Sequence, residues 1–491
     1  MDQSARHKPP LSPRPMHRRH FLNTALSAAA FAASPLSAQP ATPLRRGPES
    51  VLVVGAGLAG LVAAYRLRDA GKRVILIEAR TDPGGRVRTL RNYFADGIYG
   101  ELGAARVAET HEYVLHWLNE LNLSLTPFAP VSGAALQVVG AMAFRADDEA
   151  ARSRIVPGLH ADERRLSPSG LLLKYLQNVP DELANPETDI SDPRWREFDS
   201  VSWPRWLASR GASPAAIQLM TLGGDSSGFS ALFMLQQIML HRDSRQYMKI
   251  EGGMDRLPRS IAARLKDVIH YSCELTRLEH SPTGVRATCK TATGTETFAA
   301  DRAVLAIPFS TLRGIAVVPA FSPQKTKVIN ELSYYEATRF LLQTKTRFWE
   351  KAHLTGGARS DAPADIWDMS YGQKATSGLI SLTTGNAAIE QKLKSLGVDG
   401  QRGFGLALAK QAFPTVDAEV QKSFVQRWAQ DPYVRGAFTV FHPGQMGQWV
   451  PVIGRSEGRV AFAGEHTAPW NGWMEGAVWS GERAAQQILE Q

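Results

Sequence analysis

Cysteine and long apolar runs are scarce in this sequence, and each scarcity excludes a class of protein. Only Cys273 and Cys289 occur in the 491 residues, so the chain is not a domain held together by a disulfide framework. No apolar run approaches the about 20 residues that cross a bilayer, so we expect no stable membrane span. No spacing typical of metal ligands is visible, and we expect no metal site.

Basic residues are in excess, but they form no basic block with interleaved aromatic residues. The net charge is +9, and the first 38 residues contribute almost half of it. We therefore expect no nucleic-acid partner. Apolar residues at 44% and charged residues at 21% are the proportions of an ordinary soluble globular protein. A length of 491 residues predicts two or more domains.

Residues 1–41 have the pattern of an export signal. The paired arginines Arg18 and Arg19 precede an alanine-rich, mildly apolar run over 23–33, and small residues continue to Ala41. This pattern is typical of a twin-arginine signal, which is read by an export machinery that moves folded proteins. We expect that machinery as a partner, cleavage between Ala33 and Ala41, and a periplasmic protein. A disordered basic tail is the alternative.

The most informative stretch is 51–88, which predicts a βαβ unit. The apolar run 51–54 predicts a buried strand, 61–70 a helix, and 74–77 a second strand that ends on Glu78. An acidic residue at this place can accept both ribose hydroxyls of a dinucleotide, and its charge repels a 2′-phosphate.

The turn between the first strand and the helix carries Gly55, Gly57 and Gly60, with Leu58 and Ala59 between them. The first two glycines allow a tight turn and close approach of a pyrophosphate, and the third allows close packing of helix and strand. Because N–H groups of a helix N-terminus point at the same place, we predict a dinucleotide site here.

A second glycine motif favours FAD. Ala79 and Arg80 follow the second strand and lead to Gly85 and Arg86, and an arginine here can contact the second phosphate of a longer cofactor. With these motifs the chain resembles the flavin-containing amine oxidase superfamily, in particular its bacterial L-amino acid oxidases.

The resemblance implies an α/β fold, with a Rossmann-type FAD-binding domain like that of glutathione reductase. A substrate domain of mixed sheet and helices interrupts it. The implied segments are the signal 1–41, FAD-binding parts 48–108, 246–318 and 436–491, a helical substrate part 109–245 and a sheet part 319–435. We expect a mostly helical chain over 110–240 and assign Phe229, Phe233, Met234 and Met239 to the core.

Gly103-Ala104-Ala105-Arg106 is similar to the segment that lies along the flavin in amino acid oxidases of this family. The resemblance implies that Arg106 clamps the substrate carboxylate, and a guanidinium suits this role because it forms two parallel hydrogen bonds. The alternatives are an arginine paired with a nearby acid or with an FAD phosphate.

Arg339 marks a departure from the family. The strand-like segment 334–349 resembles one that carries a lysine linked to oxygen reactivity, and counting places Arg339 there. Arginine keeps the charge but cannot release its proton, so another electron acceptor than oxygen stays open, as does a solvated surface arginine. The resemblance also suggests Trp367 as a substrate-facing aromatic and Leu275 as a residue beside the adenine.

The C-terminal region carries the remaining motifs. Ala437 stands where relatives hold a flavin-linking cysteine, which implies a non-covalent FAD, and Phe438 and Trp473 take the places of two aromatic walls that steer the amine. The other residues that the resemblance places at the flavin or substrate are Gly464, Glu465, Gly472, Met474 and Ala477.

The function that follows is FAD-dependent oxidative deamination of an L-amino acid. The resemblance implies hydride transfer from Cα to flavin N5, giving a 2-oxo acid, ammonia and hydrogen peroxide. Two alternatives stay open: an exported amine oxidase or dehydrogenase for amines without a carboxylate, and a non-catalytic flavin-binding protein. A homodimer is compatible with the sequence.

Overall fold

The computed structural model describes residues 48–130 and 132–490. The export signal predicted over 1–41 lies outside the described residues. No helix within them is both long enough and apolar enough to cross a membrane.

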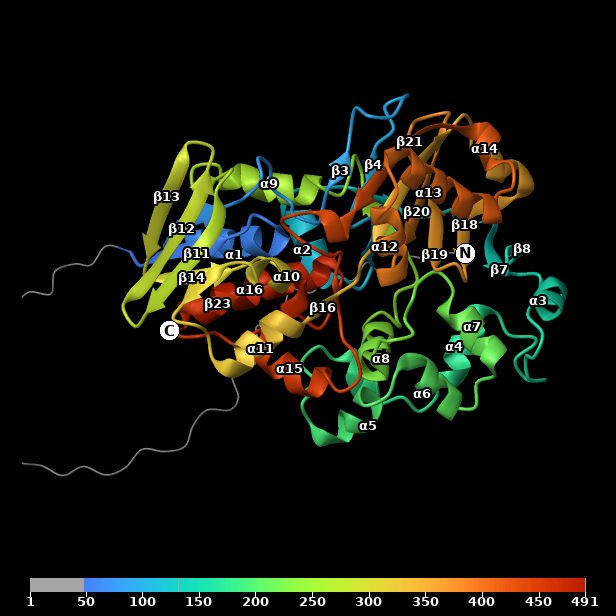
Figure 1. The fold of residues 1–491 in the computed structure, drawn as a ribbon, viewed down its shortest axis with the longest axis horizontal. Helices are drawn as coiled ribbons and strands as arrows, with labels where there is room; N and C mark the ends of the chain where they lie inside the picture. The colour runs from blue at the N-terminus through green and yellow to red at the C-terminus, as the bar shows by residue number, and fades with distance from the viewer. Residues whose placement is uncertain (1–47, 131, 491) are drawn as a thin grey trace, which may run out of the picture. The chain divides into compact units, whose positions relative to one another are not determined.

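A five-stranded parallel sheet organises the first domain, and its strands come from four distant parts of the chain (Figure 1). In spatial order they are β10 Ile269–His270, β2 Arg73–Ile77, β1 Ser50–Val54, β14 Arg302–Leu305 and β23 Val460–Phe462. All four pairings are parallel, and β1 is buried along its whole length. Continuous apolar runs in this sequence form such strands because both faces of a parallel sheet are covered.

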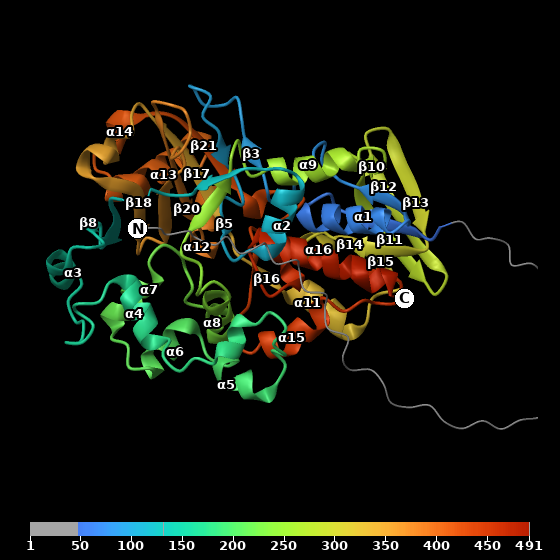
Figure 2. The same cartoon turned by 180° about the vertical axis from the view of Figure 1, so that it is seen from behind.

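Two helices from opposite ends of the chain cover this sheet together. Helix α1 (Leu58–Asp69) starts directly after β1, and α16 (Met474–Leu489) lies beside it in both views (Figures 1 and 2). The helices approach closely because Gly481 has no side chain: a Cβ there would lie 2.5 Å from the Ala59 carbonyl oxygen.

A four-stranded sheet follows β10. Its order is β13 Gly294–Ala300, β12 Gly284–Thr291, β11 Glu274–Ser281 and β15 Ala316–Val318. The chain leaves the parallel sheet after β10. It turns at Ser272, which has φ +56°, and begins β11 in a different sheet.

A seven-stranded sheet forms the second domain. Its order is β21 Val420–Arg427, β17 Thr338–Thr344, β20 Gly378–Thr384, β19 Ala364–Asp368, β18 Leu354–Ser360, β7 Ala134–Val139 and β8 Met142–Arg145. Strands β7 and β8 come from the region expected to be mostly helical, so that expectation was incomplete. β7 joins the sheet by parallel pairing with β18.

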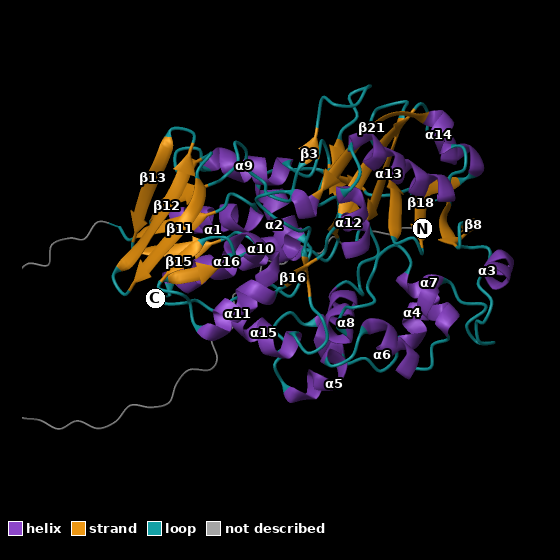
Figure 3. Cartoon of the chain, in the orientation of Figure 1, coloured by secondary structure: helices purple, strands orange, loops and turns teal. Residues whose placement is uncertain are grey.

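Opposite faces of this sheet have different roles. Phe340 points to helix α13 (Val398–Ala412) and packs on Gly405, where a Cβ would lie 2.3 Å from its ring. Because side chains alternate along a strand, the neighbour Arg339 points to the other face, toward the cavity described below. The helices of residues 168–240 gather as a separate layer (Figure 3): α4 Pro168–Tyr175, α5 Arg196–Asp199, α6 Trp203–Ser209, α7 Pro214–Thr221 and α8 Ala231–Leu240.

Small sheets join the two domains' segments. Strand β9 (Tyr247–Ile250) pairs with β5 (Val107–Ala108) and β6 (Leu125–Pro127), and β3 (Thr89–Leu90) pairs with β4 (Gly100–Glu101). The remaining elements are α2 Glu112–Glu120, α3 Glu149–Ile155, η1 Asp181–Ala184, η2 Pro193–Trp195, α9 Arg256–Arg264, α10 Phe309–Leu312, α11 Pro323–Glu331, β16 Ser333–Tyr334, η3 Phe348–Ala352, α12 Ala387–Lys394, α14 Val416–Glu419, η4 Trp428–Gln430, β22 Thr439–Val440, α15 Met446–Ile453 and η5 Glu465–Thr467.

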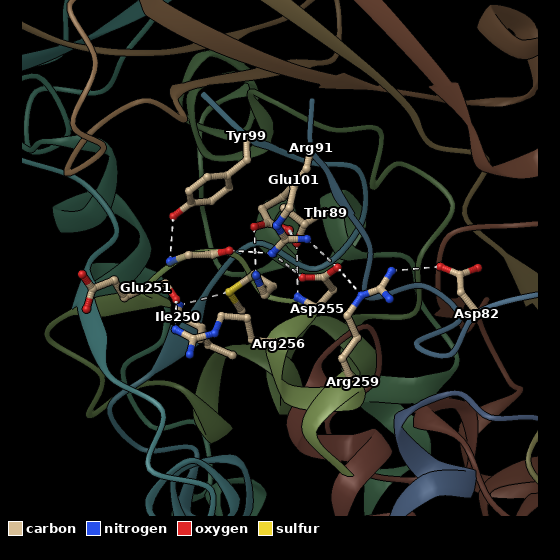
Figure 4. A network of polar contacts seen from close by, with 12 residues as sticks. Asp82, Thr89, Arg91, Tyr99, Glu101, Ile250, Glu251, Asp255, Arg256 and Arg259 are labelled. Carbon is tan, nitrogen blue, oxygen red and sulfur yellow. Dashed lines mark hydrogen bonds and ion pairs between the residues drawn. The ribbon is translucent and has the colours of Figure 1, made fainter. Parts of the chain in front are cut away.

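A buried polar network ties β3 and β4 to the start of α9 (Figure 4). Glu101 accepts hydrogen bonds from the Met254 N–H (2.9 Å) and the Thr89 hydroxyl (2.8 Å). Arg91 bonds both carboxylate oxygens of Asp255, at 2.6 and 2.7 Å. These contacts hold the segment that leads into Arg106, a predicted site residue.

Candidate active site

A cavity of about 730 Å³ lies where the parallel sheet, the seven-stranded sheet and the helical layer meet. All the residues predicted for FAD or substrate line it except Gly60. Those residues are Gly55, Gly57, Leu58, Ala59, Glu78, Ala79, Arg80, Gly85, Arg86, Gly103, Ala104, Ala105, Arg106, Leu275, Arg339, Trp367, Phe438, Gly464, Glu465, Gly472, Trp473, Met474 and Ala477. The structure thus brings together motifs that lie more than 400 residues apart.

The glycine turn has the geometry of a phosphate cradle. Gly55 has φ +99°, a value that disfavours other residues. A Cβ on Gly57 would meet no atom within 4 Å and would project into the cavity, whereas one on Gly60 would lie 1.9 Å from the Gly55 carbonyl oxygen. Gly57 therefore leaves room for a ligand, and Gly60 serves packing, which explains its absence from the cavity wall.

Glu78 lies at the end of β2. Its two oxygens accept the N–H groups of Ala56 (2.7 Å) and Arg80 (2.9 Å), which orient the carboxylate. Burial raises the pKa of Glu78, and these two donors oppose the shift. Each carboxylate oxygen has a second lone pair, so the group can still accept ribose hydroxyls.

Two arginines near the glycine motifs are held by acids. Nη1 of Arg86 donates to Glu465 (2.8 Å) and to the Ala437 carbonyl (2.9 Å), and Arg80 bonds both oxygens of Asp431. No other bond of the Arg86 guanidinium is found within 48–130 and 132–490, so Nε and Nη2 can meet a phosphate.

Arg106 is a cation inside an aromatic cage. Its guanidinium carbon lies 5.1 Å from the ring centroid of Tyr247, 5.5 Å from Trp473 and 5.7 Å from Phe128. Among the described residues no carboxylate pairs with it, and no hydrogen-bond acceptor reaches it. The alternative that Arg106 pairs with a nearby acid therefore has no support among the described residues. A half-buried guanidinium on a cavity wall with free donors can take a carboxylate ligand.

Two histidines that sequence reasoning missed support Trp473. The His241 ring lies 4.5 Å from the Trp473 ring, and the His111 ring lies 5.1 Å from it. The nitrogens Nε2 of the two histidines are 3.0 Å apart. Two isolated histidines far apart in sequence give no signal of this pairing, which arises only because β5, α2 and α8 meet.

The proton positions of this pair follow from its neighbours. The Ala108 N–H donates to Nδ1 of His111 (3.3 Å), so the His111 proton is on Nε2 and points to His241. His241 in turn donates from Nδ1 to the Gln237 carbonyl (2.7 Å). Burial, together with the charge of Arg106, lowers the pKa of both rings, that of His111 to about 3. Both rings are neutral at physiological pH.

Arg339 lies on the cavity wall, so the alternative of a solvated surface arginine is wrong. Nε donates to the Thr383 hydroxyl (3.1 Å), and Nη1 donates to the carbonyls of Glu101 (3.1 Å) and Gly103. Its guanidinium carbon lies 4.9 Å from the ring of Trp367. Burial lowers the pKa of Arg339 to about 10, so it stays charged.

The remaining walls include residues that sequence reasoning assigned to the core. Phe229, Phe233 and Met234 line the cavity. The core assignment is confirmed for Phe233 and Met239, which are 4% and 6% exposed. Phe229 and Met234 are only partly buried and pack against the same core. Helical spacing alone could not separate the two roles, because one face of α8 serves both. Phe438 stacks on Tyr335 with ring centroids 5.1 Å apart, and Tyr335 was also missed.

The comparison with known families identifies the chain. The sequence model described as "Flavin containing amine oxidoreductase" matches residues 58–489. The chain belongs to this family. Two relatives of this amine oxidoreductase are YobN of Bacillus subtilis (strain 168), whose name marks it as a candidate L-amino-acid oxidase, and the L-amino-acid oxidase of Pseudechis australis. The first is 31% identical, and the match covers 90% of this chain and 95% of YobN. The second is 28% identical, and the match covers 90% of this chain and 87% of the Pseudechis australis protein.

Solved amine oxidases share the fold of this amine oxidoreductase. Putrescine oxidase bound to putrescine superposes with a TM-score of 0.77 at 21% identity, covering 90% of this chain and 99% of that one. Cyclohexylamine oxidase from Brevibacterium oxydans IH-35A superposes with a TM-score of 0.76 at 24% identity, and the coverage of the two chains is the same as for putrescine oxidase. The predicted fold class and family are confirmed. Family membership implies a flavin, and the open space at Gly57 with the acceptor Glu78 fits its nucleotide half.

Proposed function

We propose that this protein oxidises an L-amino acid to the imino acid, which water hydrolyses to the corresponding 2-oxo acid and ammonia, while molecular oxygen takes up the two electrons and is reduced to hydrogen peroxide. The observation that carries the proposal is Arg106, a guanidinium on the cavity wall that no acid of the described chain neutralises. A substrate carboxylate supplies the missing anion, with two charge-assisted hydrogen bonds. Relatives named L-amino-acid oxidases support the same substrate class.

The side chains divide the work of orientation. Arg106 holds the carboxylate, and the walls Phe438 and Trp473 face the amine. Gly472 separates these walls: its φ is +79°, and a Cβ there would lie 3.3 Å from the Phe438 ring. Aromatic walls favour the neutral amine, because they exclude the water that stabilises an ammonium ion. Holding the Cα–H bond of the substrate in the orientation needed for hydride transfer supplies most of the rate acceleration.

FAD is the proposed cofactor, held without a covalent bond because Ala437 offers no nucleophile on the cavity wall. Gly55, Gly57, Glu78 and Arg86 would hold its nucleotide half. When bound, it supplies the two-electron acceptor for the hydride that leaves Cα. The first-turn N–H groups of α16, after Trp473, have no partners within the helix. They would stabilise negative charge at the edge of the ring system.

The test is anaerobic mixing of the purified yellow protein with L-amino acids while the flavin absorbance is followed. Bleaching by an L-amino acid but not by its decarboxylated amine is the expected result. Bleaching by amines alone would contradict the proposal and favour an amine oxidase or dehydrogenase. No bleaching by either class would favour a flavin-binding protein without turnover.

We also propose that the protein acts in the periplasm after twin-arginine export, on the strength of the motif at Arg18 and Arg19. Replacing both arginines with lysine should leave the protein in the cytoplasm when cells are fractionated. Unchanged periplasmic protein would contradict the assignment.

A further inference from the structure

A second, much smaller cavity adjoins the substrate cavity. It has a volume of about 10 Å³, and Ala105 and Phe128 line both cavities. Its other lining residues are Tyr99, Glu101, Lys249, Asp368 and Met369. Four of these five carry ionisable side chains, although Glu101, Lys249 and Asp368 are 3%, 6% and 5% exposed. A volume near 10 Å³ is about that needed for a single water molecule.

The two donors of this group have hydrogens to spare. Nζ of Lys249 donates to the carbonyls of Met369 (3.4 Å) and Tyr371, which leaves one of its three N–H bonds. The Tyr99 oxygen accepts the Gly252 N–H (3.2 Å), so its own hydroxyl hydrogen is available (Figure 4).

The two carboxylates have acceptor positions to spare. Oδ1 of Asp368 accepts the Ser370 N–H (2.8 Å), and Oδ2 has no hydrogen-bond partner among the described residues. Each Glu101 oxygen accepts one hydrogen bond, from Met254 or Thr89, and has a second lone pair (Figure 4). Lys249 forms no direct ion pair with either acid within the described chain, although both carboxylates lie close enough to raise its pKa.

We propose that this second cavity binds one water molecule, which accepts from Lys249 and Tyr99 and donates to Glu101 and Asp368. We further infer that Glu101 takes up a proton when a carboxylate binds Arg106. Two donors and two acceptors are the full complement of one water molecule. The proton uptake rests on the proposed function, because it needs an anion at Arg106; the water site does not.

The two cavities share the wall formed by Ala105 and Phe128, and charged groups lie on both sides of it. Arg339 donates to the Glu101 carbonyl, and burial lowers its pKa, an effect that Glu101 opposes and Arg106 adds to. The titratable and charged groups around Glu101 are Arg91 after β3, Tyr99 before β4, Asp255 before α9, Lys249 on β9 and Arg339 on β17. Asp368 on β19 lines the same small cavity. An anion added at Arg106 disfavours a second negative charge behind the shared wall. Burial raises the pKa of Glu101 to about 7 and lowers that of Lys249 to about 8, so protonation responds near neutral pH.

The water site is tested by a high-resolution crystal structure of the holoenzyme. One density peak at hydrogen-bond distance from all four polar side chains is expected. No peak, or a peak that contacts fewer than three of them, would overturn the site. Tyr99→Phe removes one donor and should displace or weaken the peak without disturbing the fold.

The proton uptake is tested by titrating the holoenzyme with benzoate and following the flavin spectrum between pH 6 and 9. The dissociation constant should rise about three- to tenfold across this range, the size expected for two screened charges in adjoining cavities. Glu101→Gln should flatten this dependence. The same slope in the variant would overturn the inference.

A direct count of protons keeps the inference testable if Glu101→Gln does not fold. Calorimetric titration of the wild type with benzoate in buffers of different ionisation enthalpy should show uptake at pH 7. Zero uptake would overturn the coupling. Failure of the proposed function looks different: Arg106→Leu would then bind benzoate as the wild type does, or the wild type would bind none. Unchanged benzoate binding by Arg106→Leu would show that Arg106 is not the anion site coupled to Glu101. No binding by the wild type would rule out the coupling altogether. The crystal structure tests the water site in either case.

Discussion

The guanidinium carbon of Arg106 lies 5.5 Å from the ring centroid of Trp473, and the His241 ring lies 4.5 Å from the same ring. One indole thus contacts both the proposed carboxylate clamp and a neutral histidine pair. The proposed clamp and the proposed amine wall are parts of one packed group, so a change in either should affect both ends of the substrate.

Arg106→Leu should lower kcat/KM for the preferred L-amino acid by about 10²-fold or more. The reason is the loss of two charge-assisted hydrogen bonds, each contributing about 1.5–3 kcal/mol. Turnover of the decarboxylated amine should not fall. Arg359→Leu is the matched control, because Arg359 also lines the cavity but pairs with Asp365 at 3.5 Å. Equal losses in both variants would contradict a specific clamp.

His111→Phe should weaken catalysis without removing any group that touches the substrate. Phenylalanine keeps the ring contact with Trp473 but ends the hydrogen bond to His241, so the wall loses its orientation. We expect kcat for the amino acid to fall about tenfold, with a smaller change in KM, because a misplaced substrate reacts slowly. His111→Gln supplies a donor and should restore part of the loss. If the variant changed only thermal stability and not kcat, the histidine pair would have a packing role and no role in catalysis.

Arg339→Lys should speed the reaction of the reduced flavin with oxygen by about tenfold, a barrier change of about 1.4 kcal/mol. The expectation follows from the resemblance, which implies a lysine linked to oxygen reactivity at this position. The guanidinium here is held by Thr383 and two carbonyls, whereas an ammonium is more mobile and can release its proton. Stopped-flow reoxidation measures the rate, and anaerobic reduction by substrate is the control that should change little. A slower reoxidation in the variant would argue against this role.

Gly57→Ala and Gly60→Ala form a matched pair that separates cofactor binding from folding. A methyl group on Gly57 enters open cavity space, so the apoprotein should keep its stability but bind FAD at least about tenfold more weakly. A methyl group on Gly60 meets the Gly55 carbonyl at 1.9 Å, so the apoprotein should lose about 1–3 kcal/mol. Flavin titration and denaturant unfolding measure the two effects. Loss of stability in Gly57→Ala would contradict the assignment.

Glu475→Gln should change how stability depends on pH. Glu475 accepts the N–H groups of Tyr113 and Val114, both at 2.9 Å, and burial raises its pKa to about 8. Between about pH 4.3 and this value the folded state holds a proton that the unfolded state has lost, so stability falls as pH rises. The variant should lack this component.

Chemical denaturation at pH 5 and pH 8.5 measures the difference. The advantage of the wild type over Glu475→Gln should shrink by at least about 1.4 kcal/mol, the equivalent of one pKa unit. Glu482→Gln on the same helix is the control, because its side chain is 24% exposed. A constant difference across this range would contradict the prediction.

The sequence by itself determined which residues form the glycine turns and the end of β2 on the cavity wall. Gly55, Gly57, Glu78 and Arg86 lie within 32 residues, and their spacing requires one local βαβ geometry, so the prediction needed no distant contact. The C-terminal residues Phe438 and Trp473 were also found, because their motifs resemble those of the family.

Only the tertiary structure decided what surrounds Arg106. Phe128, Tyr247 and Trp473 come from three separate segments, and β9 brings two of them together by pairing with β5 and β6. The histidine pair and the second cavity likewise depend on contacts between distant elements. Side-chain spacing along one element tells which residues share a face. It does not tell which element covers that face, because the packing partner of an element depends on the free energy of the whole packed chain and not on local spacing.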